Sequence, residues 1–512
     1  MGYVIGLDIG TSGAKALLIN EKGDIVYKTF REYPLYTPYP LWTEQDPLDW
    51  WDATISILTE IVSKSLVDPQ DIKSIGISGQ MHSAVLLDKE YNVIRPAILW
   101  SDQRTEKECR YVMELLGEDR VMEFISNPVL PGFTLGKILW VKNNEPENYK
   151  KIHKVLLPKD YIRFKMTGEL SMEITDAAGT AYFSVKEGKW CLELLRALDI
   201  PIDFFPRICK SFEVCGETTE EFESLTGIKR GTKVVGGGAD NACGAIGAGI
   251  VKEGRMLSSI GTSGVILTPT SIHRFDPKGR IHTFNHAIDN MWYLMGVELS
   301  AGMSLRWYRE TNGIMETALS SFLKRDPYEL LSSEASYSSV GSNGVIFLPY
   351  LSGERTPHKD PFARGVFFGI SISTRREDMI RAIMEGVTFG LMDSVKIMED
   401  LGVKIEEVRA IGGGAKSSLW REIQADIFGR EVSIMEKDEG PAYGAAILAT
   451  IGAGMFSNIE EAVDELVKVK EVIVPNKENT EKYRDFYNLY IKLYSSLKDR
   501  FKELSEIEEK QR

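Results

Sequence analysis

The pentapeptide IGTSG occurs twice in this chain, at Ile9–Gly13 and at Ile260–Gly264, close to half the chain apart. Each copy lies between two apolar runs, in VIGLDIGTSGAKALLI and in MLSSIGTSGVILT. Apolar and β-branched residues on both sides of a glycine-rich turn predict strand, turn and strand. A five-residue repeat is weak by itself, but its place at the start of each half predicts a duplicated α/β fold.

Both turns have the composition of an anion site. Their glycines let the backbone approach a ligand closely, and their threonine and serine hydroxyls can donate hydrogen bonds. Consecutive backbone N–H groups in such a turn form an anion-binding concavity. A plain β-hairpin turn is the alternative for either copy alone. Two such hairpins facing each other would grip one polyphosphate, which makes Thr11, Ser12, Gly261 and Thr262 candidate phosphate contacts.

Length and charge limit the classes of function. A chain of 512 residues is too long for one core and predicts two or three domains. The formal net charge of -13 argues against a nucleic-acid partner, so a phosphate ligand must be held by local groups. The five cysteines are widely spaced without a C-x-x-C pair, which suggests neither disulfides nor zinc. No apolar stretch reaches membrane length and no signal peptide is evident, so we expect a cytoplasmic protein without a membrane partner.

Two charged residues flank the first turn. Asp8 ends the first strand beside the predicted phosphate site, where a carboxylate can hold Mg²⁺ directly or through water. The alternative is an aspartate that accepts hydrogen bonds from the turn's own N–H groups. Lys15 follows the turn and is placed to neutralise phosphate charge, with a solvated surface lysine as the alternative.

The stretch KVVGGGADNACGAIGAG carries the candidate catalytic base. A strand ends in the triplet Gly236–Gly238, and Asp240 and Asn241 then open a segment of small residues that predicts a helix. Asp240 as a mere helix cap is the alternative, but a cap needs no preceding glycine triplet. The dinucleotide fingerprint G-x-G-x-x-G is absent, so this loop does not predict a Rossmann site.

A second glycine triplet lies in VRAIGGGAKSSLW, where a strand runs through Gly412–Gly414 and Ala415 into a helix that begins near Ser417. A helix N-terminus reached through glycines favours a phosphate group or a ribose edge. A tight strand-to-helix connection is the alternative. No G-x-x-x-x-G-K-[ST] motif occurs, which excludes a P-loop enzyme and leaves the two-lobed actin-like scaffold.

A polar cluster between two apolar runs suggests a site for a hydroxyl-rich ligand. Met81 and His82 follow the strand in GISGQMH, and Trp100 and Asp102 follow the next apolar run in PAILWSDQR, which we interpret as a buried strand. Carboxylates, amides and aromatic faces together bind sugars and polyols. A core histidine is the default interpretation of His82, and Asp102 is the main competitor of Asp240 as base.

Helical periodicity and composition predict further elements. The expected helices are Pro47–Lys64, a short helix at Lys137–Lys142, Glu377–Leu401, Leu419–Phe428 and a terminal helix at Thr480–Leu504 that docks on the body.

Two long segments resemble the signatures of the FGGY family of carbohydrate kinases. GFTLGKILWVKNN (Gly132–Asn144) is similar to the first signature, and GVFFGISISTRREDMIRAIME (Gly365–Glu385) is similar to the second. Within the family, GISGQMH, LPKDYIRFKMTGE, TDAAGT and FLPYLSGERTPH most closely resemble the xylulokinase members. The chain departs from their usual GGGDN in having an alanine before Asp240.

The resemblance implies two actin-like, ribonuclease-H-like lobes of α/β class with a ligand cleft between them. Residues 1–248 would form the sugar-binding lobe, and residues 249–512 the nucleotide-binding lobe with the terminal helix. The implied reaction is phosphorylation of D-xylulose to D-xylulose 5-phosphate with ATP and Mg²⁺, and a homodimer is possible. A kinase for another sugar or sugar acid, such as ribulose or gluconate, is the nearest alternative, and an actin-like ATPase is a more distant one.

The resemblance also implies roles for single residues. Asp240 would accept the hydroxyl proton, Asp8 would organise Mg²⁺, and the turn around Thr262 would contact the ATP phosphates. The remaining implied contacts are Met81 and His82 with the sugar, and Gly413, Gly414 and Ala415 with the nucleotide. Asn241, next to Asp240, is a further candidate for contact with the sugar.

Overall fold

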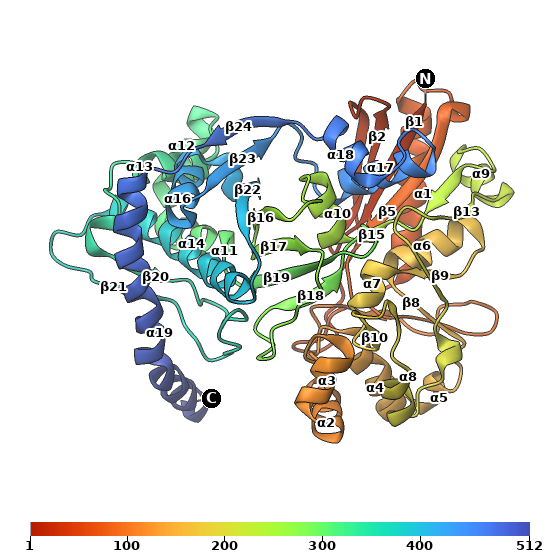
Figure 1. The fold of residues 1–512 in the computed structure, drawn as a ribbon, viewed down its shortest axis with the longest axis horizontal. Coiled ribbons are helices and arrows are strands. Elements are labelled where there is room, and N and C mark those ends of the chain that lie inside the picture. The colour runs from red at the N-terminus through yellow and green to blue at the C-terminus, as the bar shows by residue number, and fades with distance from the viewer. Residues whose placement is uncertain (1, 512) are drawn as a thin grey trace.

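Two mixed seven-stranded sheets form the centres of the two halves in the computed structural model, which describes residues 2–511 (Figure 1). The first sheet contains, in spatial order, β13 (Val214–Glu217), β14 (Lys233–Val235), β5 (Ile72–Gly79), β1 (Tyr3–Ile9), β2 (Gly13–Asn20) and β3 (Ile25–Glu32), with β15 (Gly238–Ala239) paired to β5. The second contains β18 (His282–Asn285), β19 (Trp292–Glu298), β17 (Gly264–Thr270), β16 (Gly254–Ile260), β22 (Ile405–Gly412), β23 (Glu431–Met435) and β24 (Val469–Ile473).

The two sheets share one topology. In the first, β1 pairs antiparallel with β2 across the IGTSG turn and parallel with β5. In the second, β16 pairs antiparallel with β17 across the second IGTSG turn and parallel with β22. The next strands also correspond, since β3 and β19 lie antiparallel to the hairpins while β14 and β23 extend the parallel side. The duplicated α/β fold predicted from the repeated pentapeptide is therefore confirmed.

The central strands are buried on both faces by helices. Ile5 and Leu7 of β1 belong to the same apolar cluster as the buried face of α1 (Pro47–Lys64). Val4, which points to the opposite face because side chains alternate along a strand, packs with α17 (Pro441–Gly452). The near-continuous apolar runs that predicted these strands reflect this burial on two sides.

The halves meet where α17 crosses α10 (Asp240–Gly247). A Cβ atom on Gly444 of α17 would lie 1.8 Å from the carbonyl oxygen of Cys243 in α10. The same helix lies against the first sheet, where a Cβ on Gly76 would come 2.0 Å from the carbonyl oxygen of Ala445. Small residues thus let backbone pack directly on backbone, and α17 of the second half rests on the sheet of the first.

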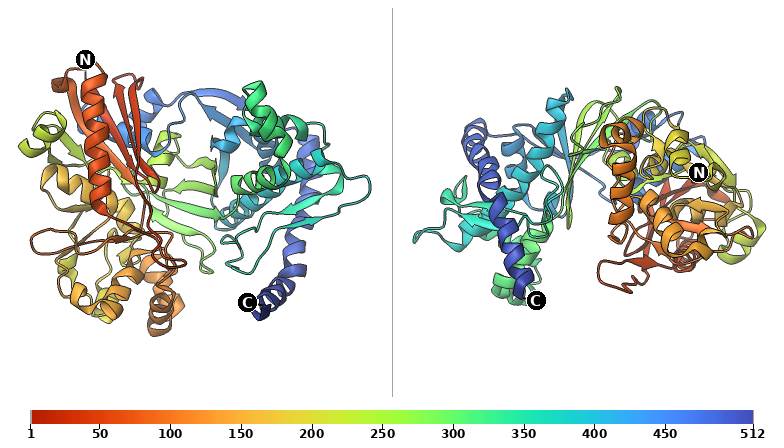
Figure 2. Two further views of the ribbon diagram at one scale, coloured as in Figure 1. Left: turned by 180° about the vertical axis from the view of Figure 1, so that it is seen from behind. Right: turned by 90° about the horizontal axis from the view of Figure 1, so that it is seen from below.

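A second connection between the halves runs through β18. The side-chain amide of Asn127 donates to the carbonyl oxygen of Thr283 at 2.7 Å and accepts from the backbone N–H of the same residue at 3.1 Å. Asn285 donates to the carbonyl oxygen of Val185 at 3.0 Å. The edge strand of the second sheet is therefore bound to loops of the first half, and Figure 2 shows the two halves from two further sides.

Further helices and strands surround the two sheets. In the first half they are η1 (Pro69–Asp71), α2 (Glu106–Leu116), α3 (Glu118–Ile125), α4 (Thr134–Asn144), α5 (Pro146–Tyr149), α6 (Pro158–Thr167), α7 (Ile174–Ala178), α8 (Leu192–Ala197), η2 (Ile202–Phe204) and α9 (Glu220–Thr226). The paired short strands are β4 (Glu44–Gln45) with β7 (Ala97–Ile98), β6 (Val85–Leu87) with β8 (Lys154–Leu156), β9 (Ser171–Glu173) with β12 (Arg207–Cys209), and β10 (Phe183–Ser184) with β11 (Lys189–Trp190). The second half adds α11 (Gly302–Asn312), α12 (Ile314–Leu323), α13 (Pro327–Ala335), η3 (Ser342–Gly344), β20 (Ile346–Leu348) with β21 (Val366–Phe368), α14 (Arg376–Asp400), α15 (Gly413–Lys416), α16 (Ser418–Phe428), α18 (Ile459–Leu466) and α19 (Lys477–Gln511).

Most predicted elements are present, with shifted bounds. The terminal helix is longer than predicted, and Tyr483 and Tyr490 of α19 are buried against the second half while the predicted contact Leu504 is exposed. The strand predicted in PAILWSDQR is reduced to the two residues of β7, because the chain turns away where Asp102 binds the backbone N–H groups of Thr43 and Arg104. The short helix predicted at Lys137–Lys142 is α4, which begins three residues earlier, at Thr134.

All five cysteines are buried free thiols. No helix within residues 2–511 combines the length and the hydrophobicity that crossing a bilayer requires. The division into lobes at residue 248 stays a prediction, since α17 follows the predicted boundary in sequence yet packs on the first sheet.

The α10–α17 contact provides a stability test. Gly444→Ala should lower the free energy of unfolding by about 1–3 kcal/mol, because the added methyl group overlaps the backbone of Cys243. Gly244→Ala in α10 is the matched control, since its Cβ would meet no atom within 4 Å and alanine favours a helix by about 1 kcal/mol. Urea denaturation of both variants measures the difference. Equal stability of the two variants would contradict the direct backbone packing.

Candidate active site

Hydrogen bonds from two glutamine side chains support the first IGTSG turn. The turn closes through a hydrogen bond from the N–H of Gly10 to the carbonyl oxygen of Gly13 at 3.1 Å. Gln45 donates to the carbonyl oxygen of Thr11 at 2.7 Å, and its own side-chain oxygen accepts from Gln80 at 3.0 Å. Thr11 and Ser12 line an open hollow of about 620 Å³ together with Glu32, Tyr33 and Leu35. The predicted ligand-facing turn is therefore rigid and accessible.

Asp8 lies at the buried end of β1, between Lys15 on β2 and Ser78 on β5 in the sheet register. Burial raises the pKa of Asp8 to about 6, although Lys15 and Ser78 act in the opposite direction. Its Oδ1 atom is buried without a hydrogen-bond partner. A buried carboxylate oxygen without a partner is suited to a cation or to a ligand donor.

Lys15 forms an ion pair with a residue that is distant in the sequence. Its ammonium group lies 2.7 Å from Oε2 of Glu439 and also donates to the backbone carbonyl of that residue at 2.9 Å. Glu439 in turn bridges to Lys28 at 2.7 Å. Lys15 thus connects the first sheet to the loop before α17, and its predicted phosphate contact stays a prediction.

Asp240 is the first residue of α10 and not its cap. The capping position is Ala239, which makes no side-chain hydrogen bond to the helix end. Oδ1 of Asp240 accepts from the backbone N–H of Asn241 at 2.7 Å and from its side-chain amide at 3.0 Å. Burial and the nearby Asp8 raise the pKa of Asp240 to about 7, with Asn241 opposing the shift. A carboxylate with a pKa near neutrality is suited to general-base catalysis.

Asn241 links this carboxylate to Met81, which precedes His82 in the chain. The amide of Asn241 contacts the sulfur of Met81 at 3.7 Å, so the two predicted sugar contacts at residues 81 and 241 meet. His82 Nδ1 lies 2.5 Å from the carbonyl oxygen of Gly179, which can only accept, so this nitrogen carries the proton. Burial lowers the pKa of His82 well below its ordinary value. The imidazole is therefore neutral, with Nε2 as a hydrogen-bond acceptor.

Trp100 and Asp102 differ in accessibility. The indole N–H of Trp100 donates to the hydroxyl of Thr11 at 2.9 Å, and the side chain is partly exposed, so it lies against the first turn. Asp102 is fully buried and forms an ion pair with Arg104 at 2.7 Å, and it accepts the N–H of Thr43 at 2.7 Å. These bonds give Asp102 a structural role, and its predicted ligand contact and competing role as base stay predictions.

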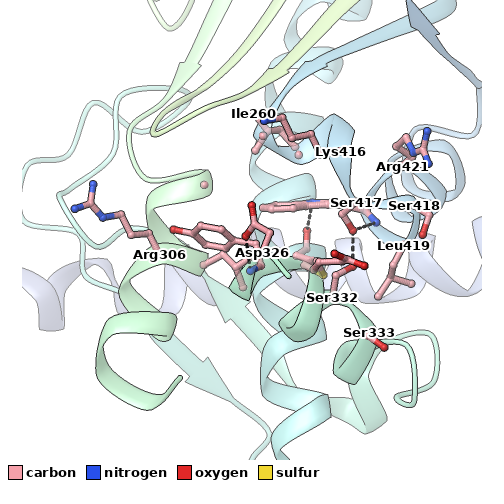
Figure 3. Close-up of a pocket in the computed structure, with 18 of the residues that line it drawn as sticks. Ile260, Arg306, Asp326, Ser332, Ser333, Lys416, Ser417, Ser418, Leu419 and Arg421 are labelled. Atoms are coloured by element: carbon pink, nitrogen blue, oxygen red, sulfur yellow. Dashed lines mark hydrogen bonds between the residues drawn. The ribbon is translucent and has the colours of Figure 1, made fainter. Parts of the chain in front are cut away.

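The second IGTSG turn and the second glycine triplet open onto one large cavity. Gly261, Thr262, Gly413 and Gly414 line a cavity of about 940 Å³ that is bounded by α11, α13 and α16 (Figure 3). The turn is fixed to α11 by a hydrogen bond from the N–H of Met303 to the carbonyl oxygen of Thr262 at 3.0 Å. Ala415 follows the triplet within α15 and is not among the residues that line the cavity.

Sequence reasoning missed most of this cavity wall. Ser332 of α13 and Ser417 at the start of α16 contact each other through their hydroxyl oxygens at 2.5 Å. Arg306 of α11 lies at the other side of the cavity, with its side chain directed away from these serines (Figure 3). The indole of Trp420 donates to the carbonyl oxygen of Met384 at 3.1 Å beneath them. The segments that supply α11 and α13 carry no glycine-rich or charged motif, so only the serines after the triplet gave a signal.

The two IGTSG turns line different cavities. The first opens on the small hollow of the first half and the second on the large cavity of the second half. Their joint grip on one polyphosphate therefore stays a prediction.

Residues 3–247 match the N-terminal domain of the FGGY family of carbohydrate kinases, and residues 256–453 match its C-terminal domain. The chain is 42% identical to the xylulose kinase of Bacillus subtilis over 98% of each chain. It is 32% identical to the gluconokinase of the same organism, again over 98% of each. The crystal structure of xylulose kinase from Rhodospirillum rubrum superposes with a TM-score of 0.90 at 30% identity, covering 98% of this chain and 99% of the other. The predicted two-lobed actin-like fold is thereby confirmed.

The proximity of the two carboxylates predicts coupled titration. Asp8→Asn should move the pKa of Asp240 from about 7 toward the ordinary aspartate value, because it removes a like charge that favours the protonated form. Carboxyl-carbon NMR of selectively labelled protein measures the shift. Asp393 is an internal control, since its pKa is raised to about 7 by burial without a contribution from Asp8. An unchanged Asp240 titration would mean that the two groups do not interact.

Proposed function

The chain belongs to the FGGY family of carbohydrate kinases and is an ATP-dependent sugar kinase, and on that basis we propose that it phosphorylates D-xylulose to D-xylulose 5-phosphate with Asp240 as general base. One observation carries the assignment of the base. Asp240 is a buried carboxylate with a pKa of about 7, and Asn241, which binds its Oδ1, also contacts Met81 beside the neutral His82.

The relatives support xylulose over other sugars. The 42%-identical protein is named a xylulose kinase, whereas the gluconokinase is 32% identical over the same share of the chain. A kinase for gluconate or ribulose therefore remains the second candidate. Membership of a sugar-kinase family displaces the actin-like ATPase as an alternative.

The proposed sugar pocket combines hydrogen-bond acceptors with aromatic faces. Nε2 of His82 accepts a hydrogen bond from a sugar hydroxyl, and the ring of His82 packs 4.6 Å from the ring of Phe133. The Asn241 amide keeps Oδ1 of Asp240 engaged, which leaves Oδ2 to approach the terminal hydroxyl of the sugar. A hydroxyl-rich ligand held this way presents one oxygen to the base.

Phosphoryl transfer is mostly positioning and charge stabilisation. Asp240 takes the proton of the sugar hydroxyl while the oxygen of that hydroxyl forms a bond to the γ-phosphorus of ATP. The bond between the γ-phosphorus and the bridging oxygen of ADP breaks, and ADP leaves. The backbone around Gly261 and Thr262 binds phosphate oxygens, and the 940 Å³ cavity behind it accommodates the nucleoside. Closure of the two halves brings the turn at Thr11 and Ser12 toward the same phosphates and excludes water.

The proposed reaction uses Mg²⁺ as its divalent ion, and Asp8 supplies a carboxylate that could bind it. The unpartnered buried Oδ1 of Asp8 is a suitable oxygen ligand, directly or through water. No group of three or more His, Cys, Asp or Glu side chains that could hold a metal ion occurs within residues 2–511. Mg²⁺ usually binds through one or two carboxylates together with phosphates and water. When bound, the ion neutralises phosphate charge.

Three further parts of the proposal come from the family resemblance. Residues 1–248 form the sugar-binding lobe, residues 249–512 form the nucleotide-binding lobe, and the protein forms a homodimer. The sequence adds the proposal that the protein acts in the cytoplasm.

The base is tested by substitution. Asp240→Asn should keep the fold and xylulose binding while kcat falls at least ~10²-fold, because a positioned base contributes ~10²–10⁴-fold. Steady-state kinetics and calorimetric titration with xylulose measure the two quantities. Asp393→Asn, which removes a buried carboxyl group of similar pKa in the other half, should leave kcat nearly unchanged. Near-normal turnover of Asp240→Asn would move the role to Asp102 or abolish it.

The substrate is tested by a panel. ADP release coupled to a reporter should give a kcat/KM for D-xylulose at least ~10-fold above those for D-ribulose and gluconate. D-ribulose differs in the configuration of one hydroxyl and gluconate carries a carboxylate, and a site built to bind hydroxyls in one arrangement leaves polar groups unpaired with either analogue. Preference for gluconate would select the second candidate. ATP hydrolysis at the same rate without any sugar would contradict a sugar kinase.

A further inference from the structure

The helix α7 lies next to two segments of the proposed site, since its start contacts the residue before Asp240 and the glycine that follows its end contacts His82. At its start, the hydroxyl of Thr175 accepts a hydrogen bond from the backbone N–H of Ala239 at 2.8 Å. At its end, Gly179 accepts the Nδ1 proton of His82. Ala239 directly precedes Asp240 in the chain, so one five-residue helix and the glycine after it bind both the segment of the proposed base and His82. Figure 1 labels this helix as α7.

Thr175 is oriented by a second bond. Its hydroxyl donates to Oε2 of Glu173 at 2.7 Å, so the oxygen lone pairs are turned toward Ala239. Oε1 of Glu173 is held in turn by the N–H of Thr175 at 3.0 Å and by the hydroxyl of Ser211 at 2.5 Å. The hydroxyl of Thr175 therefore has one rotamer that satisfies both partners, and it is fully buried.

The backbone next to Ala239 leaves room for this contact. A Cβ atom on Gly238 would lie 3.5 Å from the Thr175 hydroxyl and 2.9 Å from the sulfur of Cys243. At the other end of α7, a Cβ on Gly179 would lie 2.7 Å from the imidazole of His82. Glycine at position 179 therefore lets the end of α7 approach His82 closely, whereas the distance from Gly238 to Thr175 is an ordinary van der Waals contact.

Beneath α7 lies a cluster of five fully buried ionisable side chains. Lys159 contacts Asp160 at 2.9 Å, Asp176 at 3.0 Å and Glu173 at 3.4 Å, and Arg163 contacts Asp160 at 2.7 Å. Burial alone would lower the pKa of Lys159, but the three carboxylates raise it above its ordinary value. The cluster thus fixes both Glu173 and Asp176, the residues that flank Thr175.

Such a cluster is a poor source of stability, because desolvation of buried charges offsets most of their attraction. It does fix geometry, since each charge has few alternative partners. Arg163 also donates to the carbonyl oxygen of Gly236 at 2.8 Å, in the glycine triplet before Asp240. The loop that presents the base is therefore held at Gly236 by Arg163 and at Ala239 by Thr175.

We propose that Thr175 is a positioning residue for phosphoryl transfer, whose hydroxyl fixes the backbone before Asp240 and so aims that carboxylate at the sugar hydroxyl. This inference rests on the proposed function of Asp240. A small displacement of a catalytic group is enough to reduce turnover strongly.

Three single variants test the role. Thr175→Val removes the hydroxyl at nearly constant volume and should lower kcat at least ~10-fold with an unchanged KM for ATP, whereas Thr175→Ser should restore kcat to within about 3-fold. Thr226→Val is the matched control, because this buried threonine likewise donates to a carbonyl oxygen, of Phe222 at 2.8 Å, and accepts an N–H, of Ile228 at 3.2 Å, away from the site. A wild-type kcat for Thr175→Val, or an equal loss in Thr226→Val, would overturn the inference.

If thermal melting shows that Thr175→Val is unfolded, Thr175→Cys replaces it as a near-isosteric variant with a weak acceptor.

A double-mutant cycle separates this inference from the proposed function. In an Asp240→Asn background, Thr175→Val should change the residual kcat by less than about 2-fold, because there is no base left to aim. The same ~10-fold loss in both backgrounds would show that Thr175 acts elsewhere and would overturn the inference while leaving Asp240 as base. Near-normal turnover of Asp240→Asn alone would overturn the proposed function, and the inference with it.

Discussion

Backbone-to-backbone packing of α10 on α17 fixes how the two halves of this chain meet. Each helix follows the corresponding strand of its own sheet, α10 after the β14–β15 segment and α17 after β23, and the two cross where Gly444 meets the carbonyl oxygen of Cys243. Because α10 begins at Asp240, the same crossing sets where this carboxylate lies relative to the first sheet and Asp8. The contact requires residues without bulky side chains, and the sequence supplies glycine and alanine along both helices.

The chemistry of the site follows from burial. Burial raises the pKa of both Asp8 and Asp240, and the charge of Asp8 further disfavours ionisation of Asp240. Their pKa values rise to about 6 and 7, which leaves one group suited to a cation and the other suited to proton transfer at neutral pH. Asp102 has the same chemistry but a different environment, because Arg104 and backbone N–H groups satisfy both of its oxygens. Environment, and not residue type, distinguishes the three aspartates.

Local sequence predicted the sheets well and the site unevenly. The repeated turn, the glycine triplets and the aspartates next to them are found where a strand meets a loop or helix, as periodicity and glycine placement indicated. The strand expected in PAILWSDQR is nearly absent because Asp102 binds backbone groups that a ladder would have used. Lys15 was assigned to phosphate from its closeness in sequence to the turn, yet its ammonium binds Glu439, which is distant in sequence. Thr175 carried no signal, since its partners Glu173 and Ala239 are united only by folding.

The sequence by itself determined the secondary structure, the duplication and the family, because these depend on residues a few positions apart or on long motifs read in order. It also identified Asp8 and Asp240 as candidates, since glycine-rich strand ends are local features. Only the tertiary structure decided their pKa values, the tautomer of His82 and the support of the Asp240 loop by α7. These properties arise from burial and from single hydrogen bonds between segments far apart in the chain, and no local pattern encodes which of them will meet.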